Sequence, residues 1–447
     1  MQATSFAPLI SEIEEIKATQ HFGRVTGTRS GLIEVSGLSS HARVGDLVSL
    51  NIKGKNKLGE VLSLSEGVVT VLPSEGLKGV AIGDYVLYLG EGGIRPDTSW
   101  VGRILDAYGR PLDGVPLARG VEVRALMSPP PTATLRKRLG APVETGMTAF
   151  NTFLPIVRGQ RIGLFAGSGV GKSTLLAQFA KTIEADFIVI ALIGERGREL
   201  REFVEDTLGT EGLARSVVIA ATSDRSPIER RRAAWTAMTV AEFLRDSSAH
   251  VLFLSDSVTR FCDAHREIAV SSGETAALGG YPPSTAQTVM ELCERAGPGS
   301  EDQGDITAVF SVLVAGSDME EPIADLVRGV LDGHVVLDRS IAERGRFPAI
   351  DALRSVSRSF TKALDAAQQE TIQRAKELMA LYDETEMMIQ AGLYKAGSDP
   401  RVDRAIELRP KLESFLGSRP SKDLNTIEHN FRQLAEILDS PKAGARH

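Results

Sequence analysis

The sequence is poor in the residue types that define several classes of protein. Among its 447 residues there are 2 cysteines and 7 histidines, and neither type recurs at the close spacing of a zinc site. A disulfide-stapled scaffold is excluded, and Cys262 and Cys293 are expected to be reduced thiols. No metal is indicated by these residues.

Long apolar runs and an excess of positive charge are also missing. The longest strongly apolar run, Phe187–Ile193, is far shorter than the ~20 residues that a membrane-spanning helix needs. The net charge of -7 argues against a non-specific nucleic-acid binder. Glu12, Glu14 and Glu15 stand where a secretory signal would be basic and then apolar. A cytosolic or peripheral protein is therefore expected.

What is present is typical of a multidomain globular chain. Hydrophobic residues make up 42% and charged residues 24% of the sequence. Residues 1–20 contain Leu9, Ile13 and Ile16 at helical spacing between acidic residues, which predicts an amphipathic helix. Such a helix either folds back on its own chain or docks a partner. In residues 21–97, short apolar runs separated by glycine-rich turns predict a small β-barrel or sandwich.

Residues 98–360 form the predicted central domain, and residues 361–447 a helical C-terminal domain. The central domain opens with a Pro/Gly-rich connector (100–153), followed by near-continuous apolar runs that alternate with helical patterns. Strands are expected at 161–165, 186–193, 216–221, 250–256 and 305–314, with 348–358 beyond the last of them. This order predicts an α/β domain with a parallel sheet covered on both faces. The C-terminal core candidates are Leu364, Ile372, Ala375, Met379 and Tyr382.

The strongest chemical signal is the segment RIGLFAGSGVGKST, an apolar strand, a glycine-rich loop and the start of a helix. Backbone N–H groups of such a loop point at a polyphosphate, and the helix N-terminus favours an anion. Lys172 is predicted to contact the β- and γ-phosphates and Ser173 to place a hydroxyl on Mg²⁺. The first loop position is Ala166, where the strict pattern has glycine. The predicted nucleotide-binding residues in the loop are Gly167, Ser168, Gly169, Val170, Gly171, Lys172, Ser173 and Thr174.

Two further strands are predicted to end in charged residues at the same edge of the sheet. The run HVLFLSD ends in Asp256, whose carboxylate would lie near the metal. The run DFIVIALIG leads into Glu195 and Arg196, so Glu195 could orient the attacking water and Arg196 could lie beside the phosphates. From the pattern alone, these two residues fit a structural ion pair equally well.

Together these motifs make the chain resemble the catalytic subunits of rotary ATPases, and most closely the homohexameric ATPases of type III protein export. The resemblance covers about residues 21–438 and includes the runs GSGVGKST, IGERGRE, LFLSDSVTRF, GGYPPST and PAIDALRSVSR. It implies a RecA-like P-loop domain between a β-barrel and a helical domain. Flagellar export is favoured over virulence secretion, and a rotary ATP synthase subunit is a weaker alternative.

The resemblance also implies roles for matching residues. Glu195 matches the catalytic glutamate that polarises water, Asp256 the Mg²⁺-associated aspartate, and Arg196 and Arg260 arginines that order phosphates or carboxylates. Arg358 matches an arginine finger supplied to the neighbouring subunit, although a lone arginine is more often a surface residue. Phe347 matches the aromatic residue that stacks on adenine.

The same resemblance implies partners and a location. It implies a homohexamer, an export regulator at the N-terminal helix, a coiled-coil central-stalk protein in the pore, export-gate membrane proteins and chaperone–substrate complexes. ATP and Mg²⁺ are the implied cofactors, and the implied location is the cytoplasm, peripherally at the inner membrane beneath the flagellum.

Two alternatives in other classes remain to be tested. A hexameric nucleic-acid motor would need a basic, aromatic N-terminal domain, but residues 1–97 carry more acidic than basic side chains. A nucleotide-binding subunit without catalysis would have no need of the carboxylate at Glu195.

Overall fold

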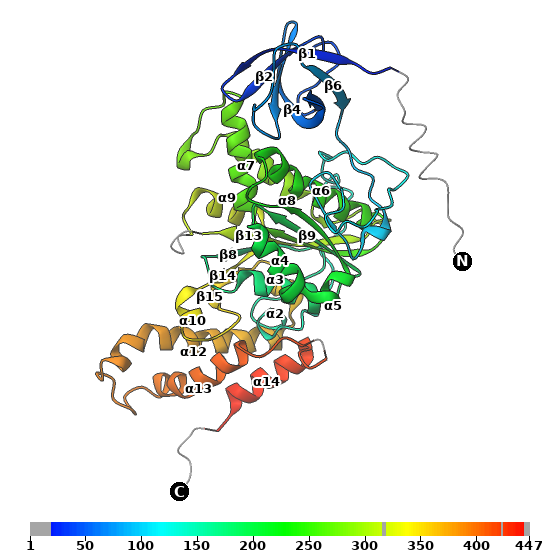
Figure 1. The fold of residues 1–447 in the computed structure, drawn as a ribbon. Coiled ribbons are helices and arrows are strands. Elements are labelled where there is room, and N and C mark those ends of the chain that lie inside the picture. The colour runs from blue at the N-terminus through cyan, green and yellow to red at the C-terminus, as the bar shows by residue number, and fades with distance from the viewer. Residues whose placement is uncertain (1–18, 315–318, 422, 442–447) are drawn as a thin grey trace.

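Figure 1 shows the computed structural model, which describes residues 19–314, 319–421 and 423–441. A β-barrel, a large sheet covered by helices and a layer of C-terminal helices follow one another in space in chain order. The three predicted kinds of architecture are confirmed. The amphipathic helix expected in residues 1–20 lies outside the described part of the chain, except for residues 19 and 20.

The barrel is built from six antiparallel strands in the order β1-β2-β5-β4-β3-β6. It closes because β1 pairs with both β2 and β6. Alternate side chains such as Val69 and Val71 are fully buried inside it, as the strand period of two requires. The strands are β1 (Phe22–Arg29), β2 (Leu32–Ser36), β3 (Leu47–Ile52), β4 (Lys55–Ser65), β5 (Val68–Pro73) and β6 (Tyr85–Gly90).

The central sheet has the strand order β15-β14-β8-β13-β11-β9-β10-β7, with β12 paired to β13. From β14 to β7 the neighbours are parallel, whereas β15 and β12 are antiparallel to their partners. The strands are β7 (Ile104–Leu105), β8 (Arg161–Ala166), β9 (Phe187–Ile193), β10 (Ser216–Ala221), β11 (His250–Asp256), β12 (Gly297–Pro298), β13 (Asp305–Leu313), β14 (Gly333–Leu337) and β15 (Ile350–Ser357).

Two parts of this sheet differ from the sequence prediction. The expectation that residues 348–358 lie beyond the last core strand is wrong, because β15 is an edge strand paired with β14. Its half-exposed pattern hid it, since only three of its eight residues are buried. The connector contributes β7, which pairs with β10. Short edge strands of this kind carry too little apolar sequence to be recognised.

Helices cover both faces of the sheet, and successive side chains of the central strands point alternately into the hydrophobic core on one face and the core on the other. Ile188 and Ile190 of β9 pack on the α3 side, while Val189 and Ala191 pack on the α6 side. The helical segments of this domain are η1 (Thr98–Trp100), α2 (Thr148–Asn151), α3 (Lys172–Thr182), α4 (Gly197–Glu202), the π-helical η2 (Phe203–Leu208), α5 (Gly209–Ala214), α6 (Pro227–Arg245), α7 (Val258–Ser271), η3 (Leu278–Gly280), α8 (Ser284–Glu294), α9 (Pro322–Val330) and α10 (Arg339–Glu343).

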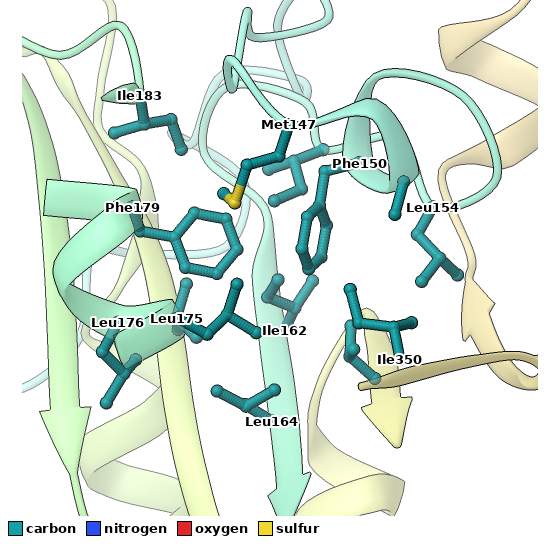
Figure 2. Packing of buried hydrophobic residues seen from close by; sticks show 14 of the residues in the cluster. Met147, Phe150, Leu154, Ile162, Leu164, Leu175, Leu176, Phe179, Ile183 and Ile350 are labelled. Carbon is teal, nitrogen blue, oxygen red and sulfur yellow. The ribbon is translucent and has the colours of Figure 1, made fainter. Parts of the chain in front are cut away.

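The core beneath the phosphate-binding loop fixes where α3 begins. Figure 2 shows Phe179 of α3 beside Phe150 and Met147, above Ile162 and Leu164 of β8. The rings of Phe150 and Phe179 lie 4.8 Å apart between centroids. Burial of aromatic and aliphatic side chains of this size contributes roughly 1.5–3 kcal/mol for each residue. The packing therefore holds α3 against β8.

The C-terminal layer is helical, as predicted. Ile372, Ala375 and Met379 are buried, while Tyr382 is only half-buried under the guanidinium of Arg409. The helices are α11 (Phe360–Ala363), α12 (Ala366–Gln390), α13 (Pro400–Leu416) and α14 (Ile427–Asp439). Across the described residues, the structure has no helix long and apolar enough to span a membrane.

A buried ion pair ties α8 to α6. The Arg295 and Glu242 side chains are 3% and 8% exposed and lie 2.6 Å apart. Arg295 also donates to the Leu126 carbonyl and to Thr239. We expect Glu242→Ala to lower the free energy of unfolding by about 3–5 kcal/mol, because it leaves a buried guanidinium without its carboxylate. Chemical denaturation measures the loss.

The matched control is the exposed pair of Arg339 and Glu343, 2.9 Å apart. Glu343→Ala should change the unfolding free energy by less than about 1 kcal/mol. Equal losses in the two variants would contradict the stabilising role given to the buried pair.

Candidate active site

The predicted phosphate-binding loop lies between the end of β8 at Ala166 and the start of α3 at Lys172. Gly169 and Gly171 have φ angles of 77° and 89°, in the left-handed region that favours glycine. A Cβ on Gly167 would meet only ordinary contacts, so its backbone does not require glycine. The N-terminus of α3 carries unpaired backbone N–H groups that can bind an anion.

Lys172 and Asp256 are brought together across the strand ends. The ammonium of Lys172 contacts the Asp256 carboxylate and lies 3.9 Å from Oε1 of Glu195. Asp256 ends β11, is 2% exposed, and accepts a 2.8 Å hydrogen bond from the Ser311 hydroxyl of β13. The buried carboxylate is thereby fixed between the loop and the next strand of the sheet.

Glu195 follows β9 and faces the same edge of the sheet. Burial, reinforced by the nearby negative charge of Asp256, raises the pKa of Glu195 to about 7, against the opposing effect of Lys172. Glu199 raises the same pKa through a hydrogen bond and its charge. A carboxylate with a pKa near neutrality is suited to general-base chemistry.

A cavity of about 180 Å³ joins these groups. Ser173, Glu195 and Asp256 all line it, with Glu199 and Glu202 on the α4 side. A hydroxyl and a carboxylate oxygen are ligands that Mg²⁺ accepts, so Ser173 and Asp256 fit a bound magnesium ion. No group of three or more metal-ligating side chains occurs among the residues that the structure describes. The protein therefore offers few ligands for magnesium, and phosphate oxygens and water would have to supply the rest of its coordination.

Phe347 lies beside the loop although it is distant in sequence. A Cβ on Gly171 would stand 3.4 Å from the Phe347 ring, and 53% of Phe347 is exposed. Ile350 pairs with Leu337, which pairs in turn with Ala166, so the start of β15 is at the loop edge of the sheet. An exposed aromatic face is available there for stacking.

The two predicted ordering arginines lie at the margin of the site. The Arg196 side chain is 81% exposed and pairs with Glu199 at 3.3 Å. The aliphatic part of Arg260 packs over Gly194, directly before Glu195, and its guanidinium lies 3.6 Å from Asp263. Among the described residues, Arg196 forms its ion pair with Glu199 and Arg260 with Asp263, and neither forms one with Asp256.

Arg358 is not in the same site. It directly follows the last residue of β15, and its backbone N–H donates to the carbonyl of Asp332. The carboxylate of Asp332 in turn accepts the backbone N–H of Arg161, at the start of β8. Arg358 therefore lies near the start of β8. The six residues of β8 separate that point from the loop, roughly 17–20 Å at strand spacing. Arg358 is exposed and donates to the Arg328 carbonyl at 3.3 Å. Its guanidinium therefore faces away from the loop of its own chain.

Sequence reasoning missed Ser311 and Glu199. Ser311 lies inside an apolar strand with no motif around it, and only the parallel register of β11 and β13 brings it to Asp256. Glu199 lies four residues after Glu195, at the spacing of one helical turn, which was a usable signal.

Comparison with known proteins gives two matching family models. Residues 146–357 match the nucleotide-binding domain of the ATP synthase alpha/beta family. Residues 364–436 match the C-terminal domain of the type III secretion ATPase EscN.

Individual relatives match over nearly the whole chain. The flagellum-specific ATP synthase of Caulobacter vibrioides is 44% identical over 97% of this chain and 99% of its own. That of Salmonella typhimurium is 40% identical over 90% of each chain. The assembled ATPase EscN of enteropathogenic E. coli, solved with its central stalk EscO, is 38% identical and superposes with a TM-score of 0.85, covering 93% of this chain and all of that one.

The raised pKa of Glu195 predicts a pH-dependent stability. The folded protein holds a proton on Glu195 up to about pH 7, whereas the unfolded chain releases it near pH 4.5. The contribution of Glu195 to the free energy of unfolding is therefore fully present below pH 4.5 and is lost as the pH rises through 7. Glu195→Gln cannot ionise and should stabilise the protein at pH 8 by about 2 kcal/mol relative to wild type, with little difference at pH 4.5. Urea unfolding at the two pH values measures this.

Glu343→Gln, at an exposed carboxylate, is the control and should show no such trend. A Glu195→Gln difference that stays constant from pH 4.5 to pH 8 would contradict the raised pKa.

Proposed function

Because the chain belongs to the ATP synthase alpha/beta family, within its group of flagellum-specific and type III secretion ATPases, we propose that it is the ATPase of a flagellar protein-export apparatus. It hydrolyses ATP, as this family does. In the proposed function, a homohexameric ring uses Mg-ATP hydrolysis to energise the export of flagellar proteins and to release chaperone–substrate complexes.

The observation that carries the flagellar assignment is the identity of 44% to a relative named flagellum-specific ATP synthase, against 38% to EscN. Relatives named flagellum-specific ATP synthase, such as that of Caulobacter vibrioides, match across barrel, nucleotide domain and C-terminal helices alike. The virulence-secretion alternative draws on the EscN structures at 38% identity. A rotary synthase subunit is disfavoured by the EscN-type C-terminal domain.

In the proposed mechanism, backbone N–H groups of the loop and Lys172 bind the phosphates, and Lys172 exchanges its contact with Asp256 for a phosphate oxygen. Ser173 and Asp256 would hold Mg²⁺, which would supply positive charge to the phosphates. Glu195 orients the attacking water and accepts its proton, since its pKa lies near working pH. The remaining loop residues, including Ser168, Val170 and Thr174, shape the pocket.

Three other residues complete the proposed site. The exposed face of Phe347 stacks on adenine beside Gly171. Arg260 orders the segment that carries Glu195 through its packing on Gly194. Arg196, highly exposed, would approach the phosphates only if its pairing with Glu199 is exchanged.

Arg358 is proposed to act on the neighbouring subunit. Its position at the opposite edge of the sheet from its own loop supports a role in trans, where its charge would offset negative charge that develops in the transition state. Fingers of this kind contribute on the order of 10³–10⁵ in rate. EscN is described as an assembled ATPase, which supports a ring here too.

Further partners follow from the proposed function. The central stalk EscO bound to EscN supports a coiled-coil stalk protein in the pore. An export regulator at the N-terminal segment, export-gate membrane proteins and chaperone–substrate complexes are proposed as well, at a cytoplasmic site beneath the flagellar base. The limits 1–20, 21–97, 98–360 and 361–447 are proposed as the corresponding domains.

Subunit mixing tests the shared site. Arg358→Ala should lower the turnover number at least about 10²-fold, and so should Glu195→Gln, each with nucleotide still bound. A mixture of the two variants should regain a measurable part of the wild-type turnover, because sites form that combine an intact Glu195 with a neighbour's intact Arg358.

Phosphate release on titrating one variant into the other measures this recovery. Mixing Arg358→Ala with Arg432→Ala, at an exposed arginine of the C-terminal helix α14 that pairs with Glu428, measures the effect of dilution alone. No recovery in the first mixture, from variants that still assemble with wild type, would contradict the proposed donation in trans.

Gene deletion tests the flagellar assignment. A deletion strain should be non-motile and should fail to secrete filament proteins, and wild-type protein should restore both, whereas Glu195→Gln protein at equal abundance should restore neither fully. Motility agar and immunoblots of culture medium report the outcome. Normal flagella in the deletion strain would remove this assignment and favour virulence secretion.

A further inference from the structure

A large cavity lies away from the candidate active site. It has a volume of about 960 Å³ and lies where the barrel, the connector and α6 meet. Leu47 and Leu87 line it from the barrel, Tyr108 and Arg110 from the connector, and Arg232 from α6. None of the phosphate-loop residues lines it. Its size falls within the range of small-molecule sites in proteins.

Arg232 brings a buried positive charge to this cavity. It is 7% exposed, its Nε has no hydrogen-bond partner, and its Nη2 donates to the Gly92 carbonyl. Its guanidinium carbon lies 4.9 Å from the centroid of the Tyr108 ring. Burial lowers the pKa of Arg232. No carboxylate of the described residues forms an ion pair with it.

The other buried arginines show that this is exceptional. Among the described residues that are buried, Arg231 pairs with Glu60, Arg245 with Asp246 and Arg295 with Glu242. Arg231 directly precedes Arg232, but only Arg231 forms an ion pair with Glu60. The charges of Glu60 and Asp106 act on Arg232 from farther away and raise its pKa against the effect of burial. A buried charge without a close partner of opposite sign is unfavourable.

A second arginine adds to the same charge. The guanidinium carbon of Arg110 lies 5.2 Å from the centroid of the same Tyr108 ring, and Arg110 lowers the pKa of Arg232 further by repulsion. Arg110 is exposed and forms no ion pair with any described carboxylate. Asp106 offsets part of this charge, since its carboxylate accepts the backbone N–H of Arg110 and raises the pKa of Arg232, but it forms no ion pair with either guanidinium. The two like charges at one ring therefore still repel each other, and a bound anion would reduce that repulsion.

We propose that this junction cavity binds a small soluble phosphate ester, whose phosphate offsets the charges of Arg110 and Arg232. Planar guanidinium groups match phosphate oxygens in geometry and bind them in pairs. The apolar walls at Leu47 and Leu87 accept an uncharged part of the ligand. Since the cavity is shared by the barrel and α6, the ligand holds these two parts together.

Calorimetry on the full chain tests this site. The protein is first saturated with ADP, so that the phosphate loop is filled, and is then titrated with inorganic pyrophosphate at physiological salt. We expect saturable binding that Arg110→Ser weakens by about tenfold, since charge-assisted hydrogen bonds are lost. Arg29→Ser, at an exposed barrel arginine outside the cavity, should bind as wild type does.

A second variant and a second probe keep the test decisive. Arg232→Met should weaken pyrophosphate binding as well, and ATPase activity confirms that each variant is folded. Absent saturable binding, or equal affinity in Arg110→Ser and wild type, overturns the proposal. Binding to phosphatidylglycerol vesicles that depends on Arg110, with none to free pyrophosphate, would assign the charge to lipid headgroups and overturn it too.

Discussion

The contact between Lys172 and Asp256 is the interaction on which the site depends. It joins the start of α3 to the end of β11, and Ser311 extends it to β13. A buried carboxylate is tolerated only with such partners. The same contact sets the electrostatics of Glu195, because the negative charge of Asp256 raises its pKa and Lys172 lowers it. Positioning and acid–base properties therefore come from one cluster.

The candidate site residues lie at two opposite ends of the strands of the central sheet. The loop, Glu195, Asp256 and Phe347 meet at the edge where the parallel strands end, while the antiparallel β15 carries the chain from Phe347 back to Arg358 at the other edge. A single chain thus holds Arg358 away from its own phosphate loop. This arrangement gives a physical reason for the proposed completion of each site by a neighbouring subunit.

Much of this was predictable from the sequence because the informative strands are buried on both faces. The predicted run 216–221 coincides with β10, and 250–256 with β11, since continuous apolar runs between helices have few other interpretations. β15 was missed because most of its residues are not buried, and Ser311 because its importance comes from the register between strands. Arg232 gave no signal in the sequence, since the lack of an ion-pair partner is a property of three-dimensional neighbours.

Turnover per chain as a function of assembly is the most direct test of the central claim. Hydrolysis should be followed over a wide range of protein concentrations, with sedimentation measured under the same conditions. Turnover per chain should follow the assembled fraction and fall toward zero for isolated chains. Isolated chains that hydrolyse ATP at the full rate would contradict a site completed by its neighbour.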